Sequence, residues 1–399
     1  MADSNYSIIT LIRGWLRLGL RRERRPAPAG PVPLAVLLGR PEDDSDTANA
    51  APHLAGLRVL ITGAGGSIGT ALARHVAALR PARLMLLDHA EHALWRVSQD
   101  LAACHPRISC QTIVADVRDP RRLGAVFAAT GPDIVLHAAA LKHVPMMEEH
   151  PLEALLTNAI GTRHVIDAAR ATNVGVTVLL STDKAVYPAS VMGASKRLAE
   201  LYCLASDRVG GGRCLPVRFG NVLGSSGSVL ELWRSQMAFG GPLVLTHPDM
   251  RRYFITPEEA VCRLLQAVVL GRGTEFPRGA LGVVDMGTPI RIVDLAERLI
   301  RAAGFTPGRD MHLRFTGPRP GEKLSEVLLH DTETALPSAA PGLLLAESRA
   351  PDLPILARAL DELEALCRAG EERLALELVS RLIPGFDPRT EGGIARLRA

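Results

Sequence analysis

A glycine-rich turn at residues 63–69 constrains the fold of this chain more than any other feature of the sequence. A short apolar strand pattern at residues 57–62 precedes the turn. An alanine- and leucine-rich helix pattern at residues 70–79 follows it, and a second strand pattern comes at residues 84–88. Strand, glycine turn, helix and strand in this order predict a βαβ unit whose turn binds the diphosphate of a dinucleotide.

Each glycine of the turn has a predicted task. Gly63 permits the tight bend, Gly66 lets the backbone approach the diphosphate, and Gly69 lets the helix pack closely on the strand. Ser67 and Ile68 lie where the helix opens, with free N–H groups and a positive dipole end toward the phosphates. We expect all five residues to bind the cofactor.

Acidic residues at two further strand ends bear on which dinucleotide binds. Asp88 ends the second strand, where a carboxylate accepts hydrogen bonds from a ribose 2′-OH but repels a 2′-phosphate. NAD is therefore favoured over NADP, although His89 and Arg96 lie near enough in sequence to compensate. Asp116 and Val117 follow a third strand pattern, and both a place beside the adenine and a turn cap fit Asp116.

The densest group of reactive side chains follows a buried strand pattern at residues 176–180. Thr182, Asp183 and Lys184 come directly after it, and Lys196 lies on the next predicted helix. Ligands of open α/β sheets bind at the carboxyl ends of the strands. We therefore expect an acid, a base and a hydroxyl to act on a bound substrate at this point.

Other residues are predicted to lie at the same edge of the sheet. A fourth strand pattern, residues 133–140, contains Ala138 and Ala139, whose small side chains let the backbone lie against the cofactor. Lys142 follows, and both a contact to a phosphate or sugar hydroxyl and a solvated position remain open for it. A sixth strand pattern ends near Asn221, and a serine- and glycine-rich turn at residues 224–228 offers its backbone to a diphosphate.

Composition narrows the class of protein. The 399 residues carry a net charge of +4, and only 4% of them are aromatic, so nothing indicates nucleic acid as a partner. The six cysteines are scattered without a metal-ligand spacing. We therefore predict no metal site and expect free thiols in a reducing cytoplasm.

The order of elements predicts an α/β fold, with a Rossmann-type doubly wound parallel sheet and a smaller C-terminal substrate-binding subdomain. We expect a basic segment and a linker at residues 1–54 and the NAD(P)-binding domain at residues 55–222. Residues 223–390 should form mainly the substrate-binding subdomain and C-terminal helices, with one long helical pattern at residues 354–383. The linker contains an apolar patch at residues 34–38 that is expected to dock on the body.

Residues 1–25 contain an amphipathic pattern, with apolar side chains on one helical face and arginines on another. Contact with an anionic membrane surface fits this pattern, and so do a solvated tail and packing against a partner. No apolar run approaches the ~18 residues of a membrane span, and no secretory signal is indicated. We expect a cytoplasmic protein, with membrane contact at the inner face as one open alternative.

Seven segments together resemble the UDP-N-acetylglucosamine 4,6-dehydratases of bacterial polysaccharide biosynthesis, which are extended short-chain dehydrogenase/reductases. The resemblance covers the chain from about residue 34 onward. Larger members of this family carry membrane spans before the catalytic half, of which this sequence keeps only a basic segment. The seven segments are Gly63–Gly69, Ala138–Pro145, Ser181–Ala185, Met192–Lys196, Arg218–Gly224, Arg252–Phe254 and Arg319–Lys323.

The resemblance implies a reaction in three steps. A hydride leaves C4 of the hexose for the nicotinamide, water is eliminated across C5 and C6 of the resulting 4-ketone, and the hydride returns to C6. By resemblance, Asp183 protonates the leaving C6 hydroxyl, Lys184 is the base at C5, and Thr182 hydrogen-bonds the C4 oxygen. Lys196 is implied to hold the nicotinamide ribose. The residues implied to bind the UDP-sugar are Lys142, Asn221, Arg252 and Glu322, with Arg252 as a bidentate donor to the diphosphate.

These roles make demands on protonation. Near neutral pH in water an aspartic acid is ionised and a lysine is protonated, whereas an acid catalyst must carry its proton and a base must lack one. Burial favours the neutral form of both side chains. A direct pairing of opposite charges would oppose it, so we expect Asp183 and Lys184 to point at different substrate atoms.

Met192 departs from the wider superfamily, because it occupies the tyrosine position of the usual Tyr-x-x-x-Lys pair. A methionine cannot take a proton from the C4 hydroxyl, so the base at C4 stays unassigned. Thr182, Lys184 and a relayed water are candidates, and Tyr187 is near in sequence but not at the four-residue spacing from Lys196. The larger dehydratases share this departure, so it does not imply an inactive enzyme.

Two other functions remain open. An epimerase would use the same transient 4-ketone, but epimerisation at C4 needs no acid such as Asp183. A non-catalytic regulator that binds NAD(P) and a nucleotide would fit Met192. The resemblance also implies self-association into a homo-oligomer, and it leaves the configuration at C5 and the final sugar open.

Overall fold

The computed structural model describes residues 32–42, 47–274 and 276–388. Within them the predicted Rossmann-type α/β fold is confirmed. A nine-stranded sheet has the order β14-β15-β11-β6-β5-β4-β1-β2-β3. The strands from β11 to β3 in this order run parallel, and the hairpin of β14 and β15 pairs antiparallel to β11 at one edge.

The bounds of the sheet strands, from one edge to the other, are β14 (Thr334–Pro337), β15 (Leu343–Glu347), β11 (Ala280–Val284), β6 (Arg213–Phe219), β5 (Val176–Thr182), β4 (Ile134–His137), β1 (Arg58–Thr62), β2 (Arg83–Asp88) and β3 (Cys110–Val114). The large sheet extends beyond the predicted end of the NAD(P)-binding domain at residue 222, because β11, β15 and β14 come late in the chain. The C-terminal part of the sequence therefore contributes to the large sheet as well as to a smaller lobe.

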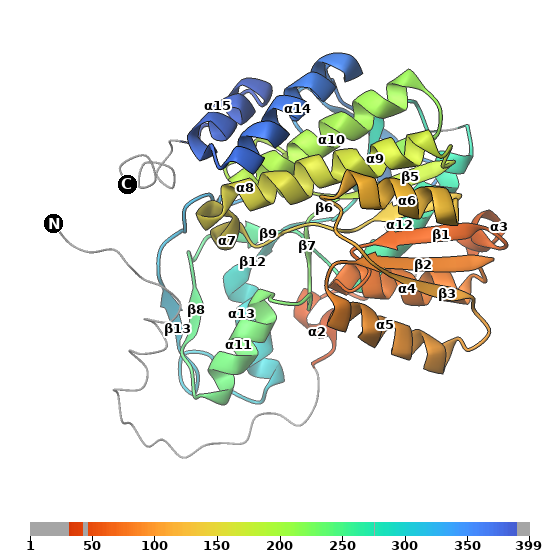
Figure 1. The fold of residues 1–399 in the computed structure, drawn as a ribbon. Helices are drawn as coiled ribbons and strands as arrows, with labels where there is room; N and C mark the ends of the chain where they lie inside the picture. Colours follow the sequence, from red (N-terminus) through yellow and green to blue (C-terminus); the bar gives the residue numbers. More distant parts are fainter. Residues whose placement is uncertain (1–31, 43–46, 275, 389–399) are drawn as a thin grey trace.

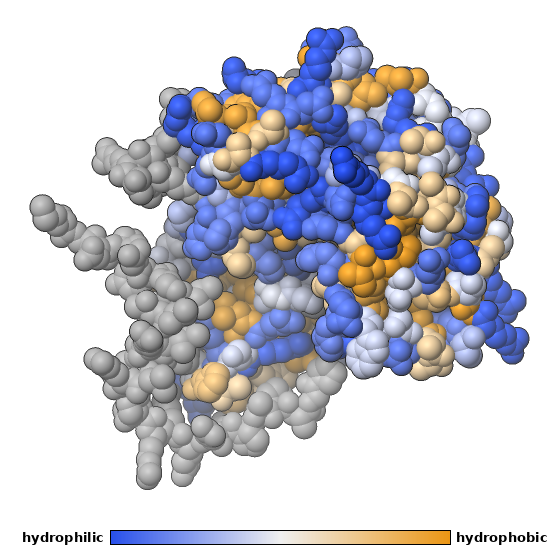
Figure 2. Space-filling model, viewed as in Figure 1, coloured by the Kyte–Doolittle hydropathy of each residue, from blue (hydrophilic) through white to orange (hydrophobic). Residues whose placement is uncertain are grey.

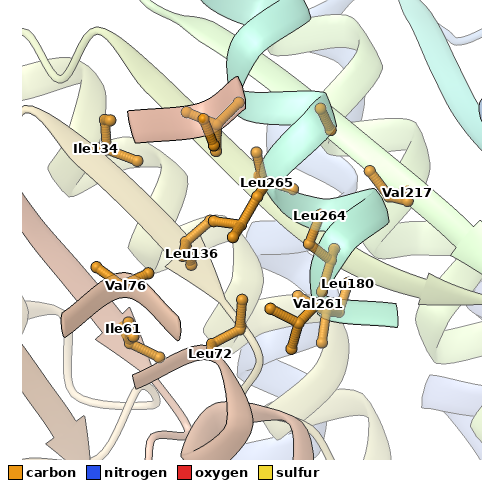
Figure 3. Packing of buried hydrophobic residues seen from close by; sticks show 14 of the residues in the cluster. Ile61, Leu72, Val76, Ile134, Leu136, Leu180, Val217, Val261, Leu264 and Leu265 are labelled. Atoms are coloured by element: carbon orange, nitrogen blue, oxygen red, sulfur yellow. The ribbon is translucent and has the colours of Figure 1, made fainter. Parts of the chain in front are cut away.

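Helices cover both faces of the sheet, so its central strands are buried on both sides. In β1, Val59 and Ile61 pack with Leu72 of α4, whereas Leu60 packs on the opposite face with Phe127 of α6. Figure 3 shows Leu72 and Ile61 beside each other in the first of these clusters. The helices of the first face are α4 (Ser67–Ala78), α5 (Glu91–Cys104) and α12 (Pro257–Arg272), and those of the second are α6 (Pro120–Thr130), α9 (Gly161–Ala171) and α10 (Val191–Val209).

Two C-terminal helices form a further layer over α9 and α10 (Figure 1). The long helical pattern predicted there is divided at Gly370, whose positive φ of 78° ends the first helix. The helices are α14 (Leu353–Ala369) and α15 (Glu372–Leu382). On the same side of the sheet, α7 (Val144–Glu149), α8 (Pro151–Ala154) and the π-helical η2 (Leu155–Ile160) lead into α9.

A smaller lobe lies beside the carboxyl ends of the strands (Figure 1). Trp233, Leu295 and Leu299 are buried in its core. Its elements are α11 (Val229–Ala238), α13 (Ile292–Ala302) and the short strand pairs β7 (Asn221–Val222) with β10 (Phe254–Ile255), β9 (Arg251–Arg252) with β12 (Ile290–Arg291), and β8 (Leu243–Leu245) with β13 (Leu313–Phe315).

The apolar patch of the linker docks on this lobe as predicted. It forms α2 (Leu34–Leu38), in which Leu37 is fully buried. Arg298 of α13 donates hydrogen bonds to the carbonyl oxygens of Leu37 and Leu38 at 2.9 and 2.7 Å. The predicted amphipathic helix within residues 1–25 lies outside the described residues.

Several element boundaries differ from the sequence patterns. Helix α4 begins at Ser67 rather than Thr70, and strand β4 ends at His137 rather than Ala140. Helix α10 begins at Val191 rather than Ser195, because the Ser190 hydroxyl accepts a hydrogen bond from the Gly193 N–H and caps an earlier start. Met192 therefore lies in the first turn of α10.

The described surface gives no sign of a membrane span. None of the helices in residues 32–388 that the structure describes is long and apolar enough to cross a bilayer. Figure 2 shows that hydrophilic side chains cover much of the viewed face and separate its apolar patches.

Candidate functional site

The glycine turn between β1 and α4 has the close contacts that its predicted task requires. Gly63 has a positive φ of 67°, and a Cβ there would lie 2.5 Å from the backbone nitrogen of Ala139. A Cβ on Gly69 would lie 2.0 Å from the Gly63 carbonyl oxygen, so only glycine lets α4 start this close to β1. Gly66 is the N-cap residue, and Ser67 and Ile68 form the first positions of α4.

Asp88 closes the turn from the neighbouring strand. Its Oδ2 accepts a hydrogen bond from the Gly65 N–H and its Oδ1 accepts one from the Ala90 N–H, both at 2.9 Å. The carboxylate is buried at the carboxyl end of β2, and the His89 ring nitrogen lies 3.4 Å from it. Asp88 thus fixes the position of the turn and keeps lone pairs for a ribose hydroxyl.

Asp116 has the geometry of a turn cap. Its carboxylate accepts hydrogen bonds from the backbone N–H and from the guanidinium of Arg118, at 2.7 to 2.9 Å. Burial raises the pKa of Asp116, but these Arg118 contacts outweigh it and lower that pKa overall. Val117 is buried and packs against Gly161 at the start of α9.

The serine- and glycine-rich turn at residues 224–228 lies against the glycine turn. The Ser226 N–H donates to the Ser67 hydroxyl at 2.9 Å, and that hydroxyl donates to the Ser226 hydroxyl at 3.0 Å. The exposed Lys142 donates to the Ser225 hydroxyl at 3.3 Å. The structure therefore brings the predicted diphosphate-binding turn, Lys142 and the start of α4 to one place.

Thr182, Asp183 and Lys184 come together at the carboxyl end of β5. Residues Asp183–Ala185 form a single turn of 3₁₀ helix, η3, directly after the strand. The Asp183 Oδ1 accepts hydrogen bonds from the Thr182 hydroxyl and from the Lys184 amine, both at 2.9 Å. The Lys184 amine also donates to Asn221 Oδ1 at 2.9 Å, which joins the end of β5 to β7.

One expectation about this pair is wrong. Asp183 and Lys184 do not point apart but form a direct ion pair, in which the Asp183 side chain is fully buried and that of Lys184 is 20% exposed. The tight turn of η3 brings the two neighbouring side chains to the same side. The second carboxylate oxygen, Asp183 Oδ2, is buried without a hydrogen-bond partner.

Two site residues were missed by sequence reasoning. Glu326 is buried, and its Oε1 lies 3.9 Å from the Lys184 amine. The Lys323 amine lies 3.5 Å from Glu326 Oε2 and donates to the carbonyl oxygen of Val186 at 2.7 Å. Burial lowers the pKa of Lys323, against the raising effect of Glu326. The signal in the sequence was an i,i+3 pair that overlaps the polar cluster at residues 319–323.

Lys196 reaches the same edge of the sheet from helix α10. Its amine donates to the carbonyl oxygen of Leu180 in β5 at 2.5 Å. Burial lowers the pKa of Lys196 to about 8, although Glu200 and Cys203 act in the opposite direction. A buried ammonium at this position supplies a positive field near the strand ends. Met192 is buried on the same helix, with 3% of its surface exposed.

Tyr187 makes its contacts with the segment at residues 328–333. Its hydroxyl accepts a hydrogen bond from the Asp331 N–H at 2.9 Å, and its ring stacks on His330 with centroids 4.2 Å apart. The side chain is 40% exposed. These contacts tie Tyr187 to the segment at residues 328–333 and give its oxygen a partner other than a substrate.

Arg252 is engaged mainly with backbone. Its Nη1 donates to the carbonyl oxygens of Arg251 and Leu324 at 2.7 and 3.2 Å, and its Nη2 donates to that of Lys323 at 2.8 Å. Both hydrogens of Nη1 and one of Nη2 are therefore used, which leaves the second hydrogen of Nη2 and that of Nε. Glu322 is half-buried and accepts a hydrogen bond from the Arg319 N–H at 3.1 Å.

A buried network of ion pairs lies next to the site. The Arg218 guanidinium donates to Glu200 at 2.8 and 3.0 Å and to Glu333 at 2.7 Å, and all three side chains are fully buried. Ser181 donates to Glu200 at 2.6 Å. Burial raises the pKa of Glu200, but Arg218 outweighs it and holds that pKa at about 2. The network links β5, β6 and α10 to the segment at residues 328–333.

A separate cavity of about 720 Å³ lies between the smaller lobe and the helix α12. It is bordered by Arg40, Glu259 and the segment at residues 284–291, and none of Asp183, Lys184 and Asn221 lines it. Among the residues that the structure describes, no group of three or more His, Cys, Asp and Glu side chains is arranged to hold a metal ion.

Comparison with known proteins identifies the family. The family model described as "polysaccharide biosynthesis protein" matches residues 59–347. The probable polysaccharide biosynthesis protein EpsC of Bacillus subtilis is 40% identical over 334 residues, which are 84% of this chain and 55% of EpsC. The capsular polysaccharide biosynthesis protein CapD of Staphylococcus aureus is 43% identical over 304 residues, or 76% of this chain and 50% of CapD. The chain thus spans about half the length of these relatives.

Solved structures agree with the fold. Pen from Bacillus thuringiensis superposes with a TM-score of 0.67 at 28% identity, covering 75% of this chain and 91% of that one. A dTDP-glucose 4,6-dehydratase, DesIV from Streptomyces venezuelae, solved with NAD, gives a TM-score of 0.59 at 23% identity, covering 68% and 88%. The second likeness shows the fold alone. With a family model that matches most of its length and relatives at 40% identity or more, the chain belongs to the polysaccharide biosynthesis protein family.

Proposed function

We propose that this protein is a nucleotide-sugar 4,6-dehydratase in surface polysaccharide biosynthesis, which converts UDP-N-acetylglucosamine or a close UDP-N-acetylhexosamine to the 4-keto-6-deoxy sugar. The observation that carries the proposal is the buried Asp183 carboxyl beside Thr182 and Lys184 at the carboxyl end of β5. One of its oxygens has no partner and is therefore free to receive a substrate hydroxyl. The relatives EpsC and CapD, both named as polysaccharide biosynthesis proteins, fit this setting.

The residues around the glycine turn fit a dinucleotide. A Cβ would fill the space at Gly63 and Gly69, and the first N–H groups of α4 would bind the phosphates. The buried Asp88 favours the 2′-OH of NAD over the phosphate of NADP. When bound, NAD supplies a hydride acceptor for C4 and returns the hydride to C6. Lys196 would hold the nicotinamide ribose.

Thr182 and Asp183 offer a route for the C4 hydroxyl proton that needs no tyrosine. The Thr182 hydroxyl already donates to Asp183 Oδ1 at 2.9 Å. A C4 hydroxyl bonded to Thr182 could pass its proton through this contact to the carboxylate. Asp183 would then carry the proton that the C6 hydroxyl needs in order to leave as water. The Asp183 carboxylate would thus first accept the proton of the C4 hydroxyl and then donate it to the C6 hydroxyl. Met192 would take part in neither proton transfer.

Lys184 would act as the base at C5 after losing its own proton. Its side chain is 20% exposed, whereas that of Asp183 is fully buried, so the lysine is the member of the pair that can exchange with solvent. Asn221 would hold the amine in place through the contact at 2.9 Å. The proton taken from C5 would return to that carbon when the hydride reaches C6, and the sum of the steps is loss of one water.

Mass analysis of the product from UDP-N-acetylglucosamine and NAD tests the proposal. Dehydration gives a product lighter by one water, and NMR of that product reports the configuration at C5. A product of unchanged mass would instead make the protein an epimerase. That outcome is relevant because a UDP-glucose 4-epimerase of Rickettsia canadensis is 34% identical over 287 residues. No turnover of any UDP-hexose would favour a nucleotide-binding regulator.

A further inference from the structure

The loop that follows β13 is fixed directly over the proposed catalytic turn. Arg252 Nη2 donates to the Lys323 carbonyl oxygen, and the Arg251 N–H donates to that of Leu324, both at 2.8 Å. The Lys323 amine donates to the Val186 carbonyl oxygen, just after η3, at 2.7 Å. Three hydrogen bonds therefore set where Glu326 lies relative to Lys184.

Glu326 has a buried oxygen without a donor. Its side chain is only 4% exposed, and Oε2 makes no hydrogen bond. The Lys323 amine forms a long ion pair with this oxygen at 3.5 Å, and the Lys184 amine lies 3.9 Å from the other oxygen. Asp183 Oδ2 likewise makes no hydrogen bond. Two buried carboxylates that share Lys184 as a neighbour thus each have one open acceptor position.

Open acceptors of this kind indicate a missing donor, because a buried carboxylate oxygen loses its hydration and normally regains a hydrogen bond. We propose that Glu326, oriented by Lys323, is a specificity-determining residue that accepts a hydrogen bond from a hydroxyl or amide N–H of the hexose. The inference rests on the proposed function and deepens it. Asp183 receives the reacting C6 hydroxyl, and Glu326 fixes the sugar by a group that does not react.

The contact also explains the placement of Lys323. A lone carboxylate beside Asp183 would repel it, whereas the Lys323 ammonium balances the added charge. Because the Lys323 amine is bound to the Val186 carbonyl oxygen, it screens Glu326 without occupying the open acceptor position. Because Glu326 is proposed to contact the sugar rather than the nucleotide, the effect of substituting Glu326 should be confined to the sugar.

Calorimetric titration with UDP and with UDP-N-acetylglucosamine separates the two parts of the ligand. The full chain is used with NAD in an Asp183→Asn background, so that the proposed elimination is blocked during the measurement. Addition of Glu326→Leu should weaken binding of UDP-N-acetylglucosamine roughly tenfold to a hundredfold, the range for a hydrogen bond to a charged group. Affinity for UDP should stay unchanged. Glu326→Gln keeps one acceptor oxygen, so it should weaken binding of UDP-N-acetylglucosamine less than Glu326→Leu does.

The controls address folding and charge. Glu362→Gln changes an exposed glutamate of α14 and should leave both affinities unchanged. The double variant Lys323→Met with Glu326→Leu removes both charges together. It is measured in place of the single variant Glu326→Leu if that single variant does not fold. It should show the same selective loss for the sugar-bearing ligand.

Three outcomes would overturn the inference. Equal losses for UDP and for UDP-N-acetylglucosamine would make the Lys323–Glu326 pair a support for the loop alone. Unchanged affinities for both ligands would place Glu326 away from the sugar. Equal affinities for the two ligands before Glu326 is changed would exclude any sugar contact. If the wild-type protein binds the UDP-sugar more tightly than UDP but releases no water, the dehydratase proposal fails while the Glu326 contact stands.

Discussion

At the scale of single residues, Asp183 and Lys184 differ in their access to solvent. The Asp183 side chain is fully buried, whereas that of Lys184 is 20% exposed. A proton on the buried carboxyl must therefore come from a neighbour inside the site, and the Thr182 hydroxyl and the Lys184 amine are both in contact with it. In the proposed mechanism, this difference fits the acid role for the aspartate and the exchangeable base role for the lysine.

Asp183→Asn tests the acid role. The amide has nearly the same shape but cannot give a proton to the leaving hydroxyl, so the rate of water loss should fall roughly 10²- to 10⁴-fold. NAD binding should be unchanged, because Asp183 is not part of the glycine turn. Single-turnover measurement of water loss by mass spectrometry checks the rate. A rate within a few-fold of wild type would remove Asp183 from the mechanism.

His137 makes folding stability depend on acid pH. Its ring lies between the hydroxyls of Thr62 and Thr162, and burial, with a smaller effect of Lys196, lowers its pKa to about 3. The unfolded chain therefore binds the additional proton between about pH 3 and pH 6.5, so the free energy of unfolding should fall as the pH decreases through this window.

The variant His137→Gln isolates this effect. Urea denaturation at several pH values should show a shallower acid dependence than in wild type, by up to one proton or about 1.4 kcal/mol per pH unit. Equal slopes for the two proteins would mean that the His137 ring is not held neutral in the folded state.

Residue identities at the site were predictable where the chemistry is local. Thr182, Asp183 and Lys184 are neighbours in sequence, and the position of Asn221 follows from the adjacency of β5 and β6. Glu326 was not predictable, because its place depends on hydrogen bonds between Arg252, Lys323 and backbone carbonyls far apart in the sequence. The direct Asp183–Lys184 contact was missed because it depends on the tight turn of η3.

At the scale of elements, the glycine turn couples cofactor binding to the packing of α4 on β1. Gly69→Ala would place a methyl group 2.0 Å from the Gly63 carbonyl oxygen. We expect a loss of roughly 1–3 kcal/mol in the free energy of unfolding, as for other overpacked positions, together with weaker NAD binding. Denaturation and NAD titration measure the two effects.

Gly124→Ala is the matched control for this prediction. Gly124 is exposed within α6, and a Cβ added there would meet no atom within 4 Å beyond its chain neighbours and the backbone of its own helix. The same substitution there should raise the free energy of unfolding by up to about 1 kcal/mol, the difference in helix propensity. Equal changes in the free energy of unfolding for Gly69→Ala and Gly124→Ala would contradict the close contact at Gly69.

Elements with a strong local pattern were predicted, and those fixed by tertiary contacts were not. The strands from β1 to β6 and the helices α4 and α10 follow from the alternation of apolar runs and helical periodicity. The antiparallel hairpin of β14 and β15 carries no such signal, because its partly exposed strands are short and pair only at the sheet edge. The break at Gly370 was missed because apolar spacing continues on both sides of it.

At the scale of the whole molecule, the C-terminal helices cover α9 and α10 on one face of the sheet (Figure 1). Leu360 of α14 is fully buried in this layer, whereas Ile355 of the same helix is 63% exposed. Leu360→Ala should lower the free energy of unfolding by roughly 2–5 kcal/mol. Ile355→Ala should change it by less than about 0.5 kcal/mol.

Chemical denaturation of the two variants tests this layer. A large decrease in the free energy of unfolding for Ile355→Ala would mean that a partner covers the exposed face of α14. A small decrease for Leu360→Ala would mean that the α14–α15 layer is not part of the cooperative fold.

The central claim is that the hydride removed from C4 returns to C6 of the same sugar after water has left. Incubation of the protein with NAD and UDP-N-acetylglucosamine deuterated at C4, followed by NMR and mass analysis of the product, tests it most directly. The account predicts a product that has lost one water and carries the deuterium at C6. Deuterium that remains at C4, or is released to the cofactor pool without loss of water, would contradict it.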